Sequence, residues 1–271
     1  MKNKRKGQFL NNEFCEMYIS TNKSVYCPGD VVSGNVFIMQ KKEISASIIE
    51  LTIRGKEKVS WEELLKGSQG NTNHKEKFQE NKELFRITQA LSEFKTKILK
   101  VGQYAFPFTF TFPDCFPGSF ELNYGFYKAK IKYSLTCTLR SDSINQEPFE
   151  FVQSFIVRQN PKVSIINATQ KASSDIKSCL FNKGISSISC KFEKDTYFPG
   201  DKAKLLIELD NQNCAVNIIH ITITLVQLIT LRISKINLEK STKFERVIFE
   251  KEFDGIQAGN MTISSRIHEI E

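Results

Sequence analysis

The sequence predicts an all-β protein built of two tandem immunoglobulin-like β-sandwich domains, the second of them truncated. Three observations support this prediction. The 271 residues suit two domains that each have a core of their own. A Pro-Gly corner followed by an apolar, β-rich segment occurs twice. Apolar and polar residues alternate strictly along much of the chain, whereas helical periodicity is scarce.

The repeated corner indicates the domain organisation. Tyr26–Asp30 reads Tyr-Cys-Pro-Gly-Asp and Tyr197–Asp201 reads Tyr-Phe-Pro-Gly-Asp, so the copies are 171 residues apart (197 − 26). This spacing is too long for a solenoid repeat and suits two domains of one design. We expect each corner to join two strands, with Val36 and Leu205 directed toward the core of their own domain.

The alternating segments predict individual strands. In residues 131–139 every second residue is apolar, which is typical of a half-buried antiparallel strand and places Cys137 in the core as a reduced thiol. Residues 106–112 predict another strand, with four aromatic residues at alternate positions. These rings are expected to be buried together: Phe106, Phe108, Phe110 and Phe112. Pro107 lacks a ladder donor, so the strand is expected to begin at, or to lie on, a sheet edge there.

Some stretches do not alternate. Trp61–Leu65 could form one helical turn, and Phe94–Leu99 could form a short helix. Polar, turn-rich composition predicts a long surface loop over Glu62–Glu83 and a hairpin loop over Ser141–Pro148.

These patterns set the predicted domain boundaries. The first sandwich covers residues 7–160, and residues 161–176 form the inter-domain linker. The second sandwich covers residues 177–271 and is incomplete, because it lacks counterparts for the last strands of the first sandwich.

Composition excludes several classes of function. The seven cysteines show no CxxC spacing and the three histidines are isolated, so we expect neither a metal site nor a cofactor. No nucleophile elbow, phosphate-binding glycine loop or paired carboxylates point to an enzyme. No apolar run is long enough to cross a bilayer and no signal peptide is recognised, so a cytoplasmic location is expected.

The net charge of +8 favours acidic partners over nucleic acid, since no nucleic-acid-binding motif accompanies it. Lys2–Lys6 is interpreted as a solvated tail, with a nuclear-import signal or a phospholipid-touching arm as alternatives.

One long motif connects this chain with a known family. Residues 99–113 read Leu-Lys-Val-Gly-Gln-Tyr-Ala-Phe-Pro-Phe-Thr-Phe-Thr-Phe-Pro and are followed by a Pro-Gly turn at Pro117. This segment resembles the N-terminal domain of the arrestin family. Four further segments fall in the family's order, and with them the resemblance, closest to the α-arrestin (arrestin-domain-containing) branch, covers about residues 10–255: Tyr26–Val36, Ala129–Leu135, Lys177–Phe181 and Tyr197–Asn211.

The chain also departs from the family pattern. Receptor-binding arrestins carry Lys-Arg-Asp where this chain has Lys23–Val25, so their phosphate-triggered release of a polar core is not expected here. Lys100 matches a lysine that contacts phosphate in those proteins. The Pro-Pro-x-Tyr sequence with which α-arrestins dock ubiquitin ligases does not occur.

The resemblance implies a cytosolic, non-catalytic adaptor for sorting or endocytosis. Its expected partners are cytoplasmic tails of membrane receptors or transporters, phosphorylated or not, with an anionic membrane surface as a further candidate. The residues predicted to contact acidic or phosphorylated cargo are Arg54, Lys56, Lys58 and Lys100. Two alternatives remain open at this point, an arrestin-fold subunit like that of retromer and an unrelated immunoglobulin-like interaction module.

Overall fold

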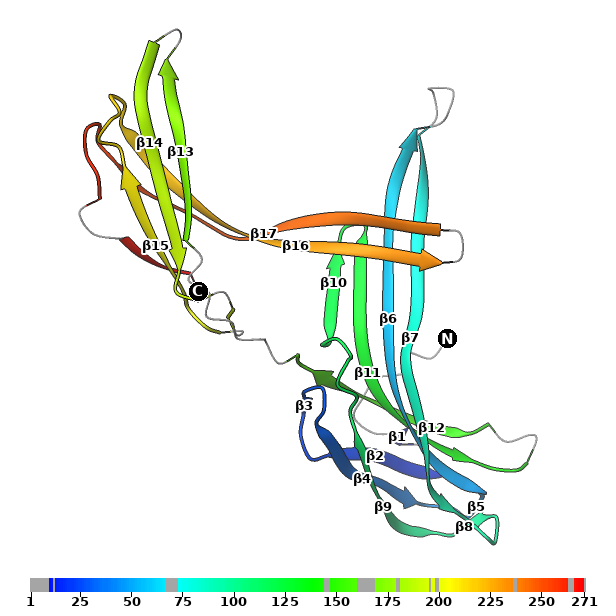
Figure 1. Ribbon diagram of the computed structural model, residues 1–271. Coiled ribbons are helices and arrows are strands. Elements are labelled where there is room, and N and C mark those ends of the chain that lie inside the picture. The colour runs from blue at the N-terminus through cyan, green and yellow to red at the C-terminus, as the bar shows by residue number, and fades with distance from the viewer. Residues whose placement is uncertain are drawn as a thin grey trace. The chain divides into compact units, whose positions relative to one another are not determined.

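The computed structural model describes residues 10–11, 13–66, 73–143, 147–159, 169–178, 181–194, 196–197, 200–235, 238–262 and 266–270. Its regular elements, β1 to β18, are all strands (Figure 1). This confirms the all-β prediction. The chain divides into two compact units, residues 1–160 with 231–242 and residues 161–230 with 243–271, which we call the first and second domains.

The first domain contains two main sheets. One has the order β1-β2-β4-β9, and its strands are β1 (Leu10–Asn11), β2 (Cys15–Thr21), β4 (Val31–Gln40) and β9 (Gly102–Thr111). The other has the order β3-β12-β11-β6-β7, and its strands are β3 (Val25–Tyr26), β12 (Phe149–Val157), β11 (Tyr127–Arg140), β6 (Ile48–Lys66) and β7 (Asn73–Glu93). A short strand, β10 (Phe120–Tyr124), pairs with β11, and the two-residue strands β5 (Ile44–Ser45) and β8 (Ile98–Leu99) pair with each other.

Alternating apolar residues from the two main sheets form the core of the first domain. Met17, Val36 and Ile53 are fully buried in it, as is Cys137, which is a free thiol. Of the four predicted rings on β9 and just after it, Phe108 and Phe112 belong to the core, whereas Phe106 and Phe110 are half-buried against it. The strand therefore faces the core with the predicted side, and it lies at a sheet edge as Pro107 suggested.

A glycine fixes the close approach of β2 and β4. Gly34 lies opposite Thr21 in the register, and a Cβ at this position would collide with the carbonyl oxygen of Ser20. A side chain there would have to push the two strands apart, so the Ser-Gly sequence that follows the first Pro-Gly corner has a steric cause.

The second domain is a smaller sandwich. One sheet has the order β13-β14-β15-β18, with β13 (Thr169–Ser178), β14 (Phe181–Phe192), β15 (Ala203–Asp210) and β18 (Arg266–Ile270). The other sheet consists of the hairpin β16 (Ile218–Lys235) and β17 (Leu238–Ile256). Leu205, Ile207, Leu209 and Ile223 form the buried centre. The truncation of this sandwich stays a prediction.

The tip of the β16–β17 hairpin, Leu231–Thr242, groups with the first domain. There the backbone N–H of Ser234 donates to a carboxylate oxygen of Glu80 at 3.0 Å, and the ammonium of Lys240 lies 5.4 Å from the ring centre of Phe78. The sequence did not predict that residues from the second half of the chain would join the first domain.

Four local predictions were wrong. Most of Glu62–Glu83 is strand, because β6 continues to Lys66 and pairs with β7 from Asn73; residues 67–72 lie outside the described part. Trp61–Leu65 is therefore extended and not helical, and Phe94–Leu99 forms a turn followed by β8. Within the predicted linker 161–176, residues from Thr169 onward form β13, paired with β14.

These errors share a physical reason. The strands concerned are rich in polar residues, because much of their side-chain surface is exposed, and their backbone groups are satisfied by a neighbouring strand that is not visible in the local sequence. The remaining domain boundaries stay predictions, as does the tail of Lys2–Lys6, which lies outside the described residues.

Candidate functional site: a basic face on the first domain

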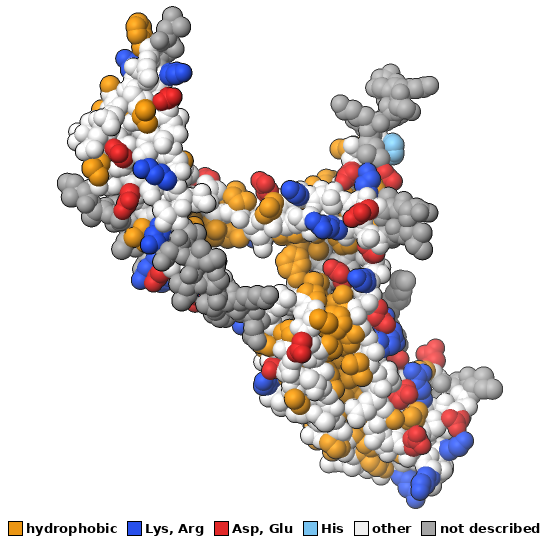
Figure 2. All heavy atoms as spheres, viewed as in Figure 1, with side chains coloured by type: hydrophobic (Ala, Val, Ile, Leu, Met, Phe, Trp, Pro, Cys, Tyr) orange, Lys and Arg blue, Asp and Glu red, His pale blue; other side chains and the backbone are white. Residues whose placement is uncertain are grey.

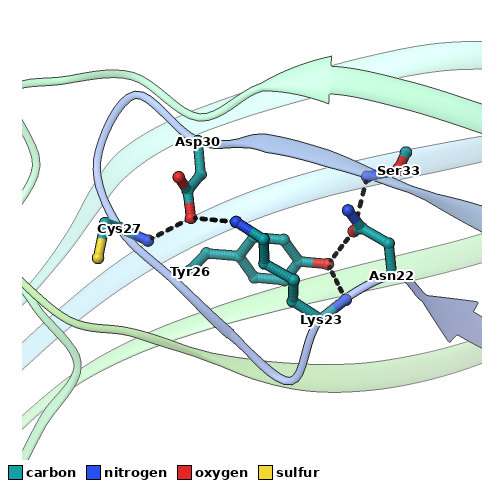
Figure 3. Close-up of polar contacts among 6 residues, drawn as sticks. All are labelled: Asn22, Lys23, Tyr26, Cys27, Asp30 and Ser33. Carbon is teal, nitrogen blue, oxygen red and sulfur yellow. Dashed lines mark hydrogen bonds and ion pairs between the residues drawn. The ribbon is translucent and has the colours of Figure 1, made fainter.

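The first Pro-Gly corner is held by a compact set of polar contacts (Figure 3). The Tyr26 hydroxyl donates to Oδ1 of Asn22 at 2.6 Å and accepts the backbone N–H of Lys23 at 3.1 Å. The backbone N–H of Cys27 donates to Asp30 at 2.9 Å, and the Lys23 ammonium lies 3.2 Å from the same carboxylate oxygen. These bonds close the loop between β2 and β4 on itself.

The contacts of the corner show the role of Lys23–Val25, the segment that stands where receptor-binding arrestins carry Lys-Arg-Asp. Lys23 is engaged by Asp30, and Val25 pairs with β12 through its backbone. The hydrogen bond from Cys27 N–H, together with Lys23, lowers the pKa of Asp30. The observed role of this segment is to hold the turn.

A row of cations on the six-stranded sheet forms the strongest candidate site. Arg54, Lys56 and Lys58 occupy alternate positions of β6, so their side chains leave the same side of the sheet. The other side of β6 carries Leu51 and Ile53, which are buried in the core. Three of the four residues predicted to contact cargo are thus brought together on the outer side of the first domain.

Neighbouring strands extend this row. In the register of β6 and β11, Lys56 lies opposite Lys132 and Lys58 lies opposite Lys130, and directly opposite residues share a face. We define the basic face by its seven cationic residues: Arg54, Lys56, Lys58, Arg86, Lys128, Lys130 and Lys132.

Two acidic residues interrupt the basic face. Glu83 of β7 lies opposite Lys56 and makes ion pairs with Arg54 and with Arg86, the latter at 3.0 Å. The hydrogen bond from Arg86 and the charges of Arg86 and Arg54 lower the pKa of Glu83. Glu121 pairs with Lys130 at 2.5 Å. The cations of the face outnumber these carboxylates, so the face keeps a positive balance.

Lys56 experiences the crowding of like charges directly. Its partial burial and the charges of Arg54 and Lys58 lower its pKa, against an opposing effect of Glu83. An anion placed beside Lys56 would offset this repulsion.

Strands β6, β7 and β11, with β10, line a hollow of about 430 Å³ that includes Lys58, Lys128 and Lys130. In Figure 2, hydrophobic side chains dominate the face turned to the viewer over β10 and β11, and charged side chains gather along the margin of the domain.

Lys100, the fourth predicted residue, is not part of the basic face. It lies in the exposed turn between β8 and β9, and its carbonyl oxygen accepts a hydrogen bond from the Tyr104 hydroxyl at 3.0 Å. Four cations of the face were missed by the sequence reasoning: Arg86, Lys128, Lys130 and Lys132. The alternation of residues 128–134 carried the signal for three of them, but only the register with β6 shows that they join Lys56 and Lys58.

Within the described residues, no group of three or more His, Cys, Asp and Glu side chains could hold a metal ion. The same part of the chain contains no helix with the length and apolarity that a bilayer crossing requires.

Comparisons with known proteins agree with this architecture. Residues 15–160 match the family model for the arrestin (or S-antigen) N-terminal domain, and residues 182–267 match the model for the C-terminal domain. The chain is 25% identical over 205 residues to arrestin domain-containing protein A of Dictyostelium discoideum, covering 72% of this chain and 34% of that protein. It is 23% identical over 202 residues to arrestin domain-containing protein 17 of Caenorhabditis elegans, covering 72% of this chain and 47% of that protein.

The chain thus spans about a third to a half of the length of these relatives. The hypothesis of an unrelated immunoglobulin-like pair is wrong, because both domain models match in the order in which the two sandwiches occur. The chain belongs to the arrestin family.

Proposed function

We propose that this protein is a non-catalytic adaptor of the cytoplasm that binds acidic or phosphorylated cytoplasmic segments of membrane proteins and links them to sorting or endocytosis. The basic face is the proposed contact surface. Family membership supports an adaptor in general, and the names of the relatives, arrestin domain-containing proteins, agree with it.

One observation carries the proposal to this face. Lys56 and Lys58 each lie directly opposite another lysine, although like charges across a strand pair reduce stability. A positively charged surface that is kept at a cost in stability is typical of a binding site for anions. The face would attract a carboxylate-rich or phosphorylated segment, and Arg54 adds a guanidinium suited to bidentate contacts.

The test is a titration of one cargo peptide in phosphorylated and unphosphorylated form. Lys56→Glu and Lys58→Glu should each weaken the phosphorylated peptide roughly tenfold or more, since a charge-assisted hydrogen bond contributes about 1.5–3 kcal/mol. The unphosphorylated peptide should lose less, and both affinities should fall as salt rises.

Lys95→Glu is the matched control, because it makes the same charge change at an exposed lysine outside the basic face. Equal losses for Lys95→Glu and Lys56→Glu would reduce the effect to net charge and overturn the site. Titration of the Lys100→Glu variant in the same series tests separately whether the turn before β9 contacts the phosphate. A pull-down can separate this function from the retromer-like alternative. Stable association with two other retromer subunits, in place of receptors or transporters, would favour that alternative.

A further inference from the structure

The hairpin of β10 and β11 ends in an aromatic turn with the sequence Tyr124-Gly125-Phe126-Tyr127. Tyr124 lies opposite Tyr127 in the register, so the loop has only two residues. Gly125 takes a φ of +53°, which suits the first position of a type II′ turn, and an added Cβ would meet no atom within 4 Å. The loop therefore has the conformation of a two-residue hairpin turn, in which Gly125 takes the positive φ.

Apolar side chains of the aromatic turn are exposed. The exposed fraction is 54% for Tyr124 and 57% for Phe126. Leu64 of β6 is 66% exposed and lies opposite Lys75 of β7, whose ammonium is 5.0 Å from the ring centre of Phe126. These three apolar side chains and Lys75 belong to one end of the sheet.

Cations flank the aromatic turn at short range. Lys128 follows Phe126 by two residues, about 7 Å along the strand, and is exposed. Lys130 and its neighbour Lys58 are about 13 Å away along the strand, and Lys56 and Lys132 about 20 Å. Because exposed charges act over roughly 8–10 Å at physiological ionic strength, Lys75 and Lys128 are within range of a surface that touches the turn, as is the opposite-charge pair of Glu62 and Lys77.

We propose that the aromatic turn inserts into the interface of an anionic lipid bilayer, with Tyr124 and Phe126 among the headgroups and Lys75 and Lys128 facing the acidic lipids. Amphipathic rings prefer this interface, and lysines near it are attracted by the negative surface potential of cytoplasmic leaflets. The combination of a small apolar anchor with basic residues is what reversible membrane binding requires.

The size of the patch distinguishes a bilayer from a protein partner. Two or three exposed side chains fall well short of the area of about 1,000 Å² that a specific protein interface needs. A bilayer needs no complementary shape, so the same side chains suffice for weak, reversible attachment. This inference goes beyond cargo binding, because it concerns a different kind of partner and, apart from Lys128, different residues.

The experiment measures partition of the full chain onto vesicles of phosphatidylcholine, with and without phosphatidylserine. Binding is expected only when phosphatidylserine is present. Tyr124→Ser combined with Phe126→Ser should reduce the partition coefficient roughly tenfold, given the apolar area withdrawn from water. Lys75→Gln and Lys128→Gln should each reduce it roughly fivefold, and only on anionic vesicles. Val101→Ser, which removes a 63% exposed side chain elsewhere on the first domain, should leave it unchanged.

A fluorescent probe tests insertion itself. The only tryptophan, Trp61, is fully buried, so a second tryptophan introduced by Phe126→Trp reports on the turn. Its emission should shift to shorter wavelength on anionic vesicles, whereas the emission of Val101→Trp should not. Thermal unfolding of each variant checks that the fold is kept.

The two proposals of this protein can fail independently. Lys56→Glu should weaken peptide binding and leave vesicle binding largely unchanged, and the double aromatic variant should do the reverse. The membrane proposal is overturned if the parent does not bind anionic vesicles, if the aromatic variant binds them as the parent does, or if the tryptophan at the turn shows no shift. A turn that proved to bind a protein without any vesicle binding would give the first of these results.

Discussion

The ammonium of Lys194 lies 2.6 Å from a carboxylate oxygen of Asp201, and this ion pair repeats the pair of Lys23 and Asp30 in the first domain. Both residues are shifted by 171 positions, the spacing of the two Pro-Gly corners. Each lysine also lies over the ring of the corner tyrosine, Lys23 at 6.0 Å from Tyr26 and Lys194 at 4.8 Å from Tyr197. Val36 and Leu205 are both buried, as the repeat predicted.

The two corners are not identical. Tyr26 belongs to β3, which pairs with β12, whereas Tyr197 lies outside any strand. The repeat therefore preserves the ion pair, whereas Tyr197 lacks the strand pairing of Tyr26. The duplicated lysine and aspartate indicate that the corner is a structural unit of this domain design.

Asp30 should make the stability of the first domain depend on acid. Its pKa is lowered in the folded protein, so the stabilisation is present above the ordinary pKa of aspartate, about 3.9, and is lost as the pH falls through the lower folded value. Urea unfolding between neutral pH and pH 2 should show a steeper acid loss for the parent than for Asp30→Asn. Parallel curves for the two proteins would contradict the role of this carboxylate.

Phe108 should be essential for the first domain, because its ring is buried between the sheets and only 4% exposed. Phe108→Ala should cost about 3–5 kcal/mol in the free energy of unfolding, or leave the protein insoluble. Thr109→Ala on the exposed side of the same strand is the control and should change stability by about 0.5 kcal/mol or less. Equal melting of parent and Phe108→Ala would show that this strand does not support the core.

Lys56 should reduce stability where it stands. Its partial burial and its like-charged neighbours disfavour the charged form, so Lys56→Gln should raise the free energy of unfolding by roughly 0.5 kcal/mol at neutral pH. The gain should shrink when salt screens the neighbouring charges. Urea unfolding at low and high salt measures this, with Lys95→Gln as the neutral comparison. A loss of stability in Lys56→Gln would mean that its pairing with Glu83 outweighs the repulsion.

The cysteines should differ sharply in reactivity. Burial raises the pKa of Cys137 to about 12, so almost no thiolate is present at neutral pH, and the pKa of Cys15 is raised by burial as well. Cys115 is exposed. Brief maleimide treatment followed by peptide mass spectrometry should find label on Cys115 but not on Cys137 or Cys15 until denaturant is added. Early modification of Cys137 would show that the core opens readily.

Local patterns predicted the elements whose two sides differ in environment. β9 and β11 have one side in the core and one in solvent, so the alternation of apolar and polar residues could be recognised in their sequences. β7 and β13 were missed because their side chains are mostly exposed and polar, which in a sequence resembles a loop. For the candidate site, Arg54, Lys56 and Lys58 could be chosen from a single strand, but Arg86 could not.

The sequence alone determined the fold class, the duplication and the family. Alternation, Pro-Gly corners and ordered motifs are local features, so they can be recognised without knowledge of the tertiary structure. The tertiary structure decided which charges act together. Lys56 and Lys132 are 76 residues apart in the chain (132 − 56) and become neighbours only through the register of β6 and β11. Register depends on the pairing of whole strands, and a shift by one residue would turn either lysine to the opposite side of the sheet. A basic face is therefore a property of the assembled sheet, whereas its individual lysines are a property of the sequence.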